Sequence, residues 1–183
     1  RISYVGQSGG AVYGTLLLAM EPSIGAGALN VGGGPSVDIY RLGVRGLRQI
    51  IGSAIAARTP SLLNATVADD PAKPSFAFID NIPLRNQPVA VHSTPGAMEI
   101  QQLLDRMSWV SQPANPVAYA PYLRESPLPG HPRKRVLVQF AKGDRSMTNP
   151  TTTALIRAGQ LTDCTTLYRA DLAQTSDPRG MPK

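Results

Sequence analysis

One short stretch of the sequence has residue types and a spacing that could support covalent chemistry: the segment GQSGG at residues 6–10. A β-favouring run precedes it and an apolar helical stretch follows it. In a G-x-S-x-G turn between a strand and a helix, the serine is strained and its hydroxyl points out of the end of the sheet. We expect a side chain at Gly6 or Gly10 to collide with the neighbouring strand or helix. The pattern predicts that Ser8 is a nucleophile. The alternative is an ordinary glycine-rich strand–helix connection.

The elements that must position Ser8 can be read on either side of it. Residues 2–5 predict a strand, and residues 11–20 predict a helix that is apolar almost all round and should be buried. The free N–H groups at the start of that helix would face an oxyanion formed at Ser8. Residues 24–31 predict the next parallel strand. The glycine triplet at residues 32–34 has no phosphate-binding motif around it, so we expect a flexible rim of a cleft there.

Residues 37–130 differ in sequence pattern from the core segments on either side, and they predict a cap-like insertion over a cleft. Residues 37–58 and 98–109 have helical spacing of their apolar positions, and residues 115–123 are apolar and interrupted by prolines. Residues 59–95 are rich in proline and polar residues, and their pattern favours neither a helix nor a strand. A set of ordinary crossover helices is the alternative to a cap.

The core pattern resumes after the insertion. Residues 135–141 form a nearly continuous apolar run, which predicts a strand covered on both faces. A loop, a helix at residues 151–158 and a last strand at residues 165–169 follow. This order predicts an α/β fold with a mostly parallel sheet, flanking helices and a helical cap insertion. We expect one domain overall, with core segments at residues 1–36 and 131–183 around the insertion at residues 37–130.

Composition excludes several classes of function. With 183 residues and 42% hydrophobic content, the chain can bury a substantial core. The net charge is +6, but basic residues cluster only at 131–135 and 5% of residues are aromatic, which argues against a nucleic-acid surface. No apolar run is long enough to span a bilayer. The single cysteine, Cys164, excludes internal disulfides and a cysteine zinc cluster, and we expect it to be a small hydrophobe at the start of a strand.

Four features in order resemble the carboxyl-terminal half of an α/β-hydrolase of the esterase/lipase type. They are the turn at residues 6–10, the strand at residues 24–31, the cap-like insertion, and the strand that leads to Gly143-Asp144 with Met147 three residues on. The match covers roughly residues 1–36 and 130–170. The turn and the aspartate loop are specific as a pair, whereas caps vary freely.

The resemblance implies a catalytic machinery without a metal or cofactor. Ser8 would attack an ester carbonyl, Asp144 would be the acid of a Ser–Asp–His triad, and the Gly9 N–H would be one oxyanion-hole donor. The second donor would come from an earlier loop that is not in this sequence. Asp144 as a plain turn or helix-cap residue is the alternative. The acids in the insertion are poorer candidates; they are Asp69, Asp70 and Asp80.

The sequence departs from the family pattern at the catalytic histidine. The family places it after the last strand, but residues 170–183 contain none. His131 enters the strand that precedes Asp144 at the wrong end, about a sheet-length from Ser8. His92, in the insertion, is a weak fallback. We therefore expect the histidine beyond Lys183, and we expect the sequence to lack parts of its chain at both ends.

The sequence thus predicts a carboxylic-ester hydrolase that works through an acyl-serine intermediate on a small ester, while this segment alone should be inactive. Apolar residues of the insertion favour a hydrophobic substrate; they are Met98, Leu103, Leu104, Met107, Trp109 and Tyr119. Two alternatives from another class are a non-catalytic binding protein with the hydrolase fold and an inactive fragment. A nucleotide-binding protein that uses residues 32–34 is a third alternative, which the lack of a phosphate-binding motif argues against. The sequence gives no indication of a cellular location.

Overall fold

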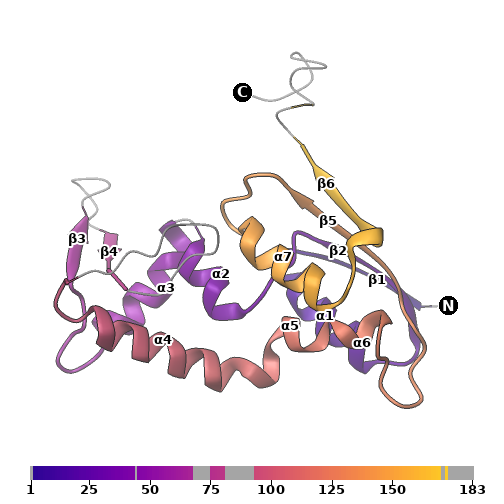
Figure 1. Ribbon diagram of the computed structural model, residues 1–183, viewed down its shortest axis with the longest axis horizontal. Helices are drawn as coiled ribbons and strands as arrows, with labels where there is room; N and C mark the ends of the chain where they lie inside the picture. Colours follow the sequence, from indigo (N-terminus) through magenta and orange to yellow (C-terminus); the bar gives the residue numbers. More distant parts are fainter. Residues whose placement is uncertain (1, 44, 68–74, 81–92, 170–171, 173–183) are drawn as a thin grey trace. The chain divides into compact units, whose positions relative to one another are not determined.

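The computed structural model describes residues 2–43, 45–67, 75–80, 93–169 and 172 (Figure 1). By its contacts the chain divides into two compact units. The first, called the sheet unit here, consists of Arg1–Pro35 and Ala114–Lys183, and the second, called the helical unit, consists of Ser36–Pro113. The cap role predicted for residues 37–130 stays a prediction.

The sheet unit contains a four-stranded parallel sheet, which confirms the predicted α/β fold class (Figure 1). The strand order is β1-β2-β5-β6. The strands are β1 (Ile2–Gln7), β2 (Ile24–Asn30), β5 (Arg135–Ala141) and β6 (Thr165–Tyr168). Because all four strands run in the same direction, their carboxyl ends share one edge of the sheet.

Helices connect these strands, and the helices after β1 and β5 lie where the sequence predicts them. They are α1 (Gly9–Met20), α5 (Pro116–Tyr119), α6 (Pro121–Arg124) and α7 (Asn149–Ala158), with a 3-10 turn, η2 (Thr162–Cys164), before β6. Cys164 is partly buried and is the last residue of that turn, so it lies directly before the strand.

The core of the sheet unit lies on one face of the sheet. Residues of β5 alternate between buried and exposed, and the buried ones pack with residues of α1, α6 and α7. On the opposite face, the side chain of Leu137 is 41% exposed. The expectation that both faces of this strand are covered is therefore wrong for the described residues. The expectation of a fully buried α1 is also wrong, because Tyr13 is 74% exposed.

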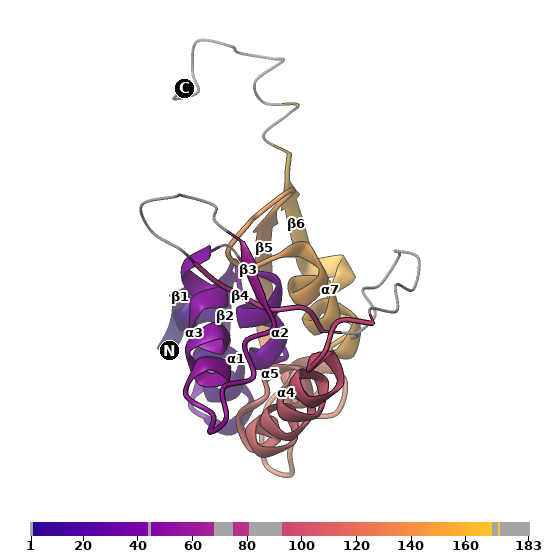
Figure 2. The ribbon, with the colours of Figure 1, turned by 90° about the vertical axis from the view of Figure 1, so that its left-hand side faces the viewer.

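The described part of the helical unit contains three helices and a short antiparallel strand pair (Figure 2). Its elements are α2 (Ser36–Leu42), α3 (Arg45–Ala56), β3 (Ala65–Val67), β4 (Ser75–Ala77) and α4 (Ala97–Ser111), followed by the 3-10 turn η1 (Gln112–Ala114). It has its own small core, made of Val37, Ile51, Ile55, Phe78, Ile100 and Leu104. Within the described part of the chain, no helix combines the length and the apolar character needed to cross a membrane.

Candidate functional site

Ser8 lies between the last residue of β1 and the first residue of α1, in a strained conformation. Its φ is 52° and its ψ is −119°, values that a residue with a side chain seldom adopts. Its N–H donates to the carbonyl oxygen of Asn30 at 2.9 Å, and its own carbonyl accepts from Ala11 N at 2.9 Å and Val12 N at 3.1 Å. These bonds fix the turn on both sides. Ser8 itself is exposed.

The glycines around Ser8 have different reasons to be glycine. A Cβ at Gly6 would lie 2.5 Å from the carbonyl oxygen of Gly10, so this position has no room for a side chain. A Cβ at Gly10 would meet only the Tyr4 hydroxyl, at 3.8 Å, which is an ordinary contact. The expected collision is confirmed at Gly6 and is wrong at Gly10. At Gly9, a Cβ would meet nothing within 4 Å.

The start of α1 offers hydrogen-bond donors beside Ser8. Gly9 is the first residue of α1 and is exposed. The first N–H groups of an α-helix have no acceptor within the helix, and they lie at the positive end of the helix dipole. The geometry therefore suits an anion next to Ser8, although the role of Gly9 as an oxyanion donor is a prediction.

Asp144 lies in the tight loop that follows β5. Its Oδ1 accepts hydrogen bonds from Ser146 N at 2.8 Å and from Met147 N at 3.1 Å, and the side chain of Met147 is buried. These are the bonds of a turn residue, as the alternative interpretation expects. They use one carboxylate oxygen, and no described residue donates to Oδ2. The loop thus fixes the carboxylate and leaves Oδ2 as an acceptor for another donor.

The side chain of Asn149 closes this loop. Its Oδ1 accepts from Gly143 N at 2.9 Å, and its Nδ2 donates to the carbonyl oxygen of Ala141 at 2.7 Å. Gly143 has a φ of 77°, in the left-handed region that favours glycine. Asn149 therefore holds the backbone on both sides of the turn that contains Asp144.

Ser8 and Asp144 follow strands that are two positions apart in one parallel sheet. The register places Gln7 level with Asn30, and Asn30 level with Gln139 near the end of β5. Two spacings of about 4.8 Å separate β1 from β5, so the two loops leave the same sheet edge roughly 10 Å apart. The structure brings both predicted residues to this edge.

A second strained residue, Val31, lies beside the Ser8 turn. It follows β2 with a φ of 48°, which is unusual for a β-branched residue. Its N–H donates to the carbonyl oxygen of Gln139 at 2.7 Å. Backbone strain of this kind persists where the surrounding structure over-determines it, and it gathers at functional sites.

The glycine triplet after Val31 is not the flexible rim predicted from the sequence. All three glycines are buried. A Cβ at Gly33 would lie 2.6 Å from Thr151 Oγ1, and one at Gly34 would lie 2.9 Å from side-chain carbons of Pro116 and Val117. The triplet is glycine because other segments pack directly onto its backbone.

The structure separates His131 from the Ser8 turn. One ring nitrogen of His131 lies 3.0 Å from the carbonyl oxygen of Met20, at the far end of α1. Since α1 has 12 residues, its ends are about 18 Å apart. The other ring nitrogen lies 3.1 Å from the carbonyl oxygen of Pro129. His131 therefore joins loops away from the candidate site, and His92 lies outside the described residues.

Lys134, like His131, contacts main-chain carbonyls near the end of α1. Its side chain is 2% exposed, and its Nζ donates to the carbonyl oxygens of Glu21 and Ile24, at 2.7 Å each. Burial lowers the pKa of Lys134, and the carboxylate of Glu21 opposes that shift. Lys134 thus ties the start of β5 to the connection between α1 and β2.

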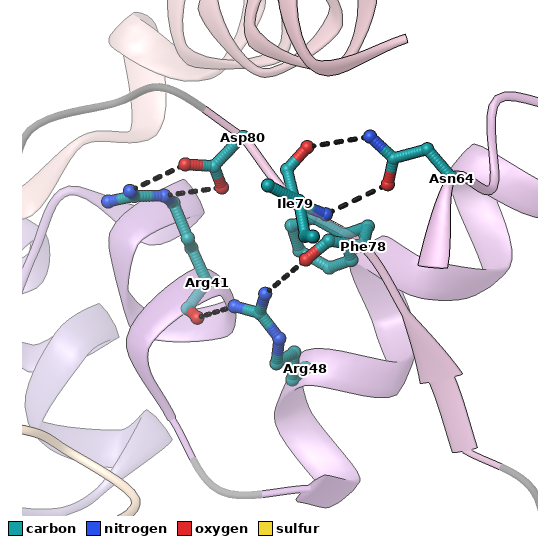
Figure 3. Close-up of polar contacts among 6 residues, drawn as sticks. All are labelled: Arg41, Arg48, Asn64, Phe78, Ile79 and Asp80. Atoms are coloured by element: carbon teal, nitrogen blue, oxygen red, sulfur yellow. Dashed lines mark hydrogen bonds and ion pairs between the residues drawn. The ribbon is translucent and has the colours of Figure 1, made fainter. Parts of the chain in front are cut away.

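The helical unit contains a buried polar cluster around Arg41 (Figure 3). The guanidinium of Arg41 donates to both carboxylate oxygens of Asp80, at 3.0 and 2.9 Å, and both side chains are 7% exposed. Arg48 donates to the carbonyl oxygens of Arg41 and Phe78, and its guanidinium lies 3.9 Å from the centre of the Phe78 ring. Asp80 is thus engaged in an ion pair. Asp69 and Asp70 lie outside the described residues.

Asn64 completes the cluster from the other side. Its side-chain amide donates to the carbonyl oxygen of Ile79 and accepts from Ile79 N, at 2.9 Å each (Figure 3). The segment at residues 78–80 is therefore held by the side chains of Arg48, Asn64 and Arg41. Burial raises the pKa of nearby Asp38, with Arg41 lowering it and Asp80 raising it.

The apolar residues expected to line a substrate site do not share one role. Leu104 is buried in the core of the helical unit, and Leu103 and Met107 pack against that core. Met98 and Trp109 are 52% and 78% exposed. Tyr119 belongs to the sheet unit, where it packs against the core and makes an edge-to-face contact with Tyr122. Core packing therefore accounts for most of this set.

The described residues contain no group of three or more histidine, cysteine, aspartate or glutamate side chains that could hold a metal ion.

Comparison with known proteins gives one distant structural similarity. No protein-family model matches the chain, and no curated protein matches it. The structure is similar to that of the uncomplexed acylaminoacyl peptidase of Pyrococcus horikoshii, with a TM-score of 0.43 and 12% sequence identity. The match covers 92% of this chain and 18% of the peptidase, so the chain spans less than a fifth of that protein. At this TM-score the similarity carries no argument about activity.

Proposed function

We propose that this chain carries the nucleophile and acid of a serine hydrolase that cleaves carboxylic esters through an acyl-serine intermediate. The observation that carries the proposal is the backbone of Ser8, with a φ of 52° between a parallel strand and a helix. An ordinary strand–helix connection needs no such strain, whereas a serine presented to a substrate from a tight turn does. Asp144 supports the proposal because it leaves the same edge of the sheet.

In the proposed reaction, Ser8 Oγ attacks the ester carbonyl carbon while a histidine takes its proton. The Gly9 N–H donates to the oxyanion that forms. The tetrahedral intermediate collapses to an acyl-serine, and the alcohol leaves with the proton from the histidine. Water then attacks the acyl group in the same way and releases the acid. Asp144 orients the histidine and stabilises its charged form.

The histidine of this scheme is not assigned. His131 is tied to the far end of α1, so it is not the base. We expect the base beyond Lys183, with His92 as the weak fallback. A His92→Ala variant that keeps full activity would exclude that fallback.

One observation favours a second candidate function, a binding protein that retains the fold. Ser8 is exposed, and no described residue donates to or accepts from its hydroxyl, so no base is seen to activate it. A binding protein would use the same sheet edge without chemistry. It would leave Ser8 unreactive toward reagents that require an activated serine.

The test uses the protein expressed from its complete natural coding sequence. A fluorophosphonate probe should label it once, at Ser8, and p-nitrophenyl esters of increasing acyl length should be hydrolysed. Ser8→Ala should abolish both signals, whereas Ser23→Ala, at another exposed serine, should change neither. Labelling that persists in Ser8→Ala would contradict the proposal. A folded protein with no labelling would favour the binding protein.

A further inference from the structure

We propose that Thr152 is a positioning residue for Ser8, and that it acts through the backbone of residues 30–34. This inference rests on the proposed function, because it concerns the geometry of the same serine. Thr152 lies in α7, the helix that follows the Asp144 loop. Thr152 therefore links α7, the helix after the Asp144 loop, to the Ser8 turn.

Hydrogen bonds join these parts in series. The N–H of Ser8 donates to the carbonyl of Asn30 at 2.9 Å, and two residues later the carbonyl of Gly32 accepts from Thr152 Oγ1 at 2.7 Å. Thr152 is fully buried, with 0% exposure. A buried carbonyl that loses its donor has no water to replace it, so the Thr152 hydroxyl strongly favours this one path of the backbone.

Close packing holds the same segment from two sides. A Cβ at Gly32 would lie 3.0 Å from the Cβ of Ala11, in the first turn of α1. The N–H of Gly34 donates to the carbonyl of Thr151 at 3.2 Å. Residues 32–34 therefore lie between the start of α1 and the start of α7. A shift of this segment would change the position of the Ser8 turn relative to the Asp144 loop.

The backbone strain at Val31 makes the position of this segment sensitive to the loss of the Thr152 hydroxyl. Its φ of 48° lies within the segment, between the carbonyl that binds Ser8 and the carbonyl that binds Thr152. A strained residue relaxes when the contacts that hold it are removed. Loss of the Thr152 hydroxyl should let Val31 relax, and the carbonyl of Asn30 should then move away from the amide of Ser8.

The experiment compares three variants in the complete natural protein. Thr152→Val keeps the shape of the side chain and removes its hydroxyl, whereas Thr152→Ser keeps the hydroxyl and removes the methyl group. Thr153→Val is the matched control, because among the described residues Thr153 Oγ1 bonds within its own segment, to the carbonyls of Asn149 and Pro150. The first measurement is amide hydrogen exchange of Ser8 and of Val138 by NMR. The second is the fluorophosphonate reaction, separated into probe affinity and maximal rate.

We expect Thr152→Val to speed amide exchange at Ser8 while the amide of Val138 in the core stays protected. Thr152→Ser should leave the amide of Ser8 as protected as in the unmodified protein. The maximal labelling rate should fall about 10- to 100-fold with little change in probe affinity, as for a misplaced nucleophile. Unchanged Ser8 exchange in Thr152→Val, or an equal effect of Thr153→Val, would overturn the inference. Faster Ser8 exchange in a protein that the probe never labels would support the positioning and reject the proposed function.

Discussion

The hydroxyl of Tyr4 donates a hydrogen bond to the main-chain carbonyl of Gly10 at 2.6 Å. The strand that enters the Ser8 turn is thereby tied to the helix that leaves it. The Tyr4 ring also lies directly under α1, because a Cβ at Gly14 would come within 2.2 Å of it. The shape of the turn consequently depends on this tyrosine as well as on the glycines beside Ser8.

The first prediction separates the two kinds of glycine in the turn. Gly6→Ala should destabilise the protein by about 1–3 kcal/mol or more, because the new Cβ would overlap the carbonyl oxygen of Gly10. Gly9→Ala should be nearly neutral, since nothing lies within 4 Å of its Cβ position. Urea unfolding followed by circular dichroism measures both. Equal unfolding midpoints for the two variants would show that the turn is not packed as described.

Much of the sheet unit follows from local sequence pattern. The sequence predicted all four strands close to their observed positions, and β5 begins and ends where expected. The G-x-S-x-G spacing predicted a strained serine between a strand and a helix. These features depend on neighbours in the sequence, so a sequence can reveal them.

The remaining features depend on contacts between distant segments. The burial of residues 32–34 requires α7, which is more than a hundred residues away, so a glycine triplet alone was open to the wrong interpretation. The positive φ of Val31 and the role of Asn149 in the acid loop have no sequence period that would reveal them. The single helix expected over residues 37–58 is two helices, separated after Leu42.

The second prediction concerns Asp144. Asp144→Asn should keep the loop, because the amide oxygen can accept the bonds from Ser146 N and Met147 N that Oδ1 now accepts. If Asp144 is the triad acid, loss of its charge should lower ester turnover by about 10⁴-fold, as expected for a misoriented histidine. The measurement is kcat in the complete natural protein, with the unfolding midpoint as control. Turnover within a few-fold of the original, with the fold intact, would assign Asp144 to the turn alone.

The third prediction addresses the buried ion pair of the helical unit. Asp80→Asn should cost about 3–5 kcal/mol, because it removes the negative charge from a buried, bidentate ion pair with Arg41. Asp105→Asn, at an exposed position of α4, is the control and should change stability little. Urea unfolding compares the two variants. If Asp80→Asn were as stable as the control, the pair would have to be open to water in solution.

The last prediction is a pH dependence caused by Asp38. Burial raises the pKa of this carboxyl in the folded state, so the unfolded chain releases the proton at a lower pH than the folded chain does. Stability should therefore fall as the pH rises from the unfolded pKa through the raised folded pKa, and the penalty should be fully present above it.

Asp38→Asn removes this penalty. At pH 7 its urea midpoint should exceed that of the unmodified protein, and the difference should vanish below the unfolded pKa. The control is Glu99→Gln, at an exposed site in the same unit, measured over the same pH range. A constant difference across the whole pH range would mean that packing, not ionisation, distinguishes Asp38→Asn.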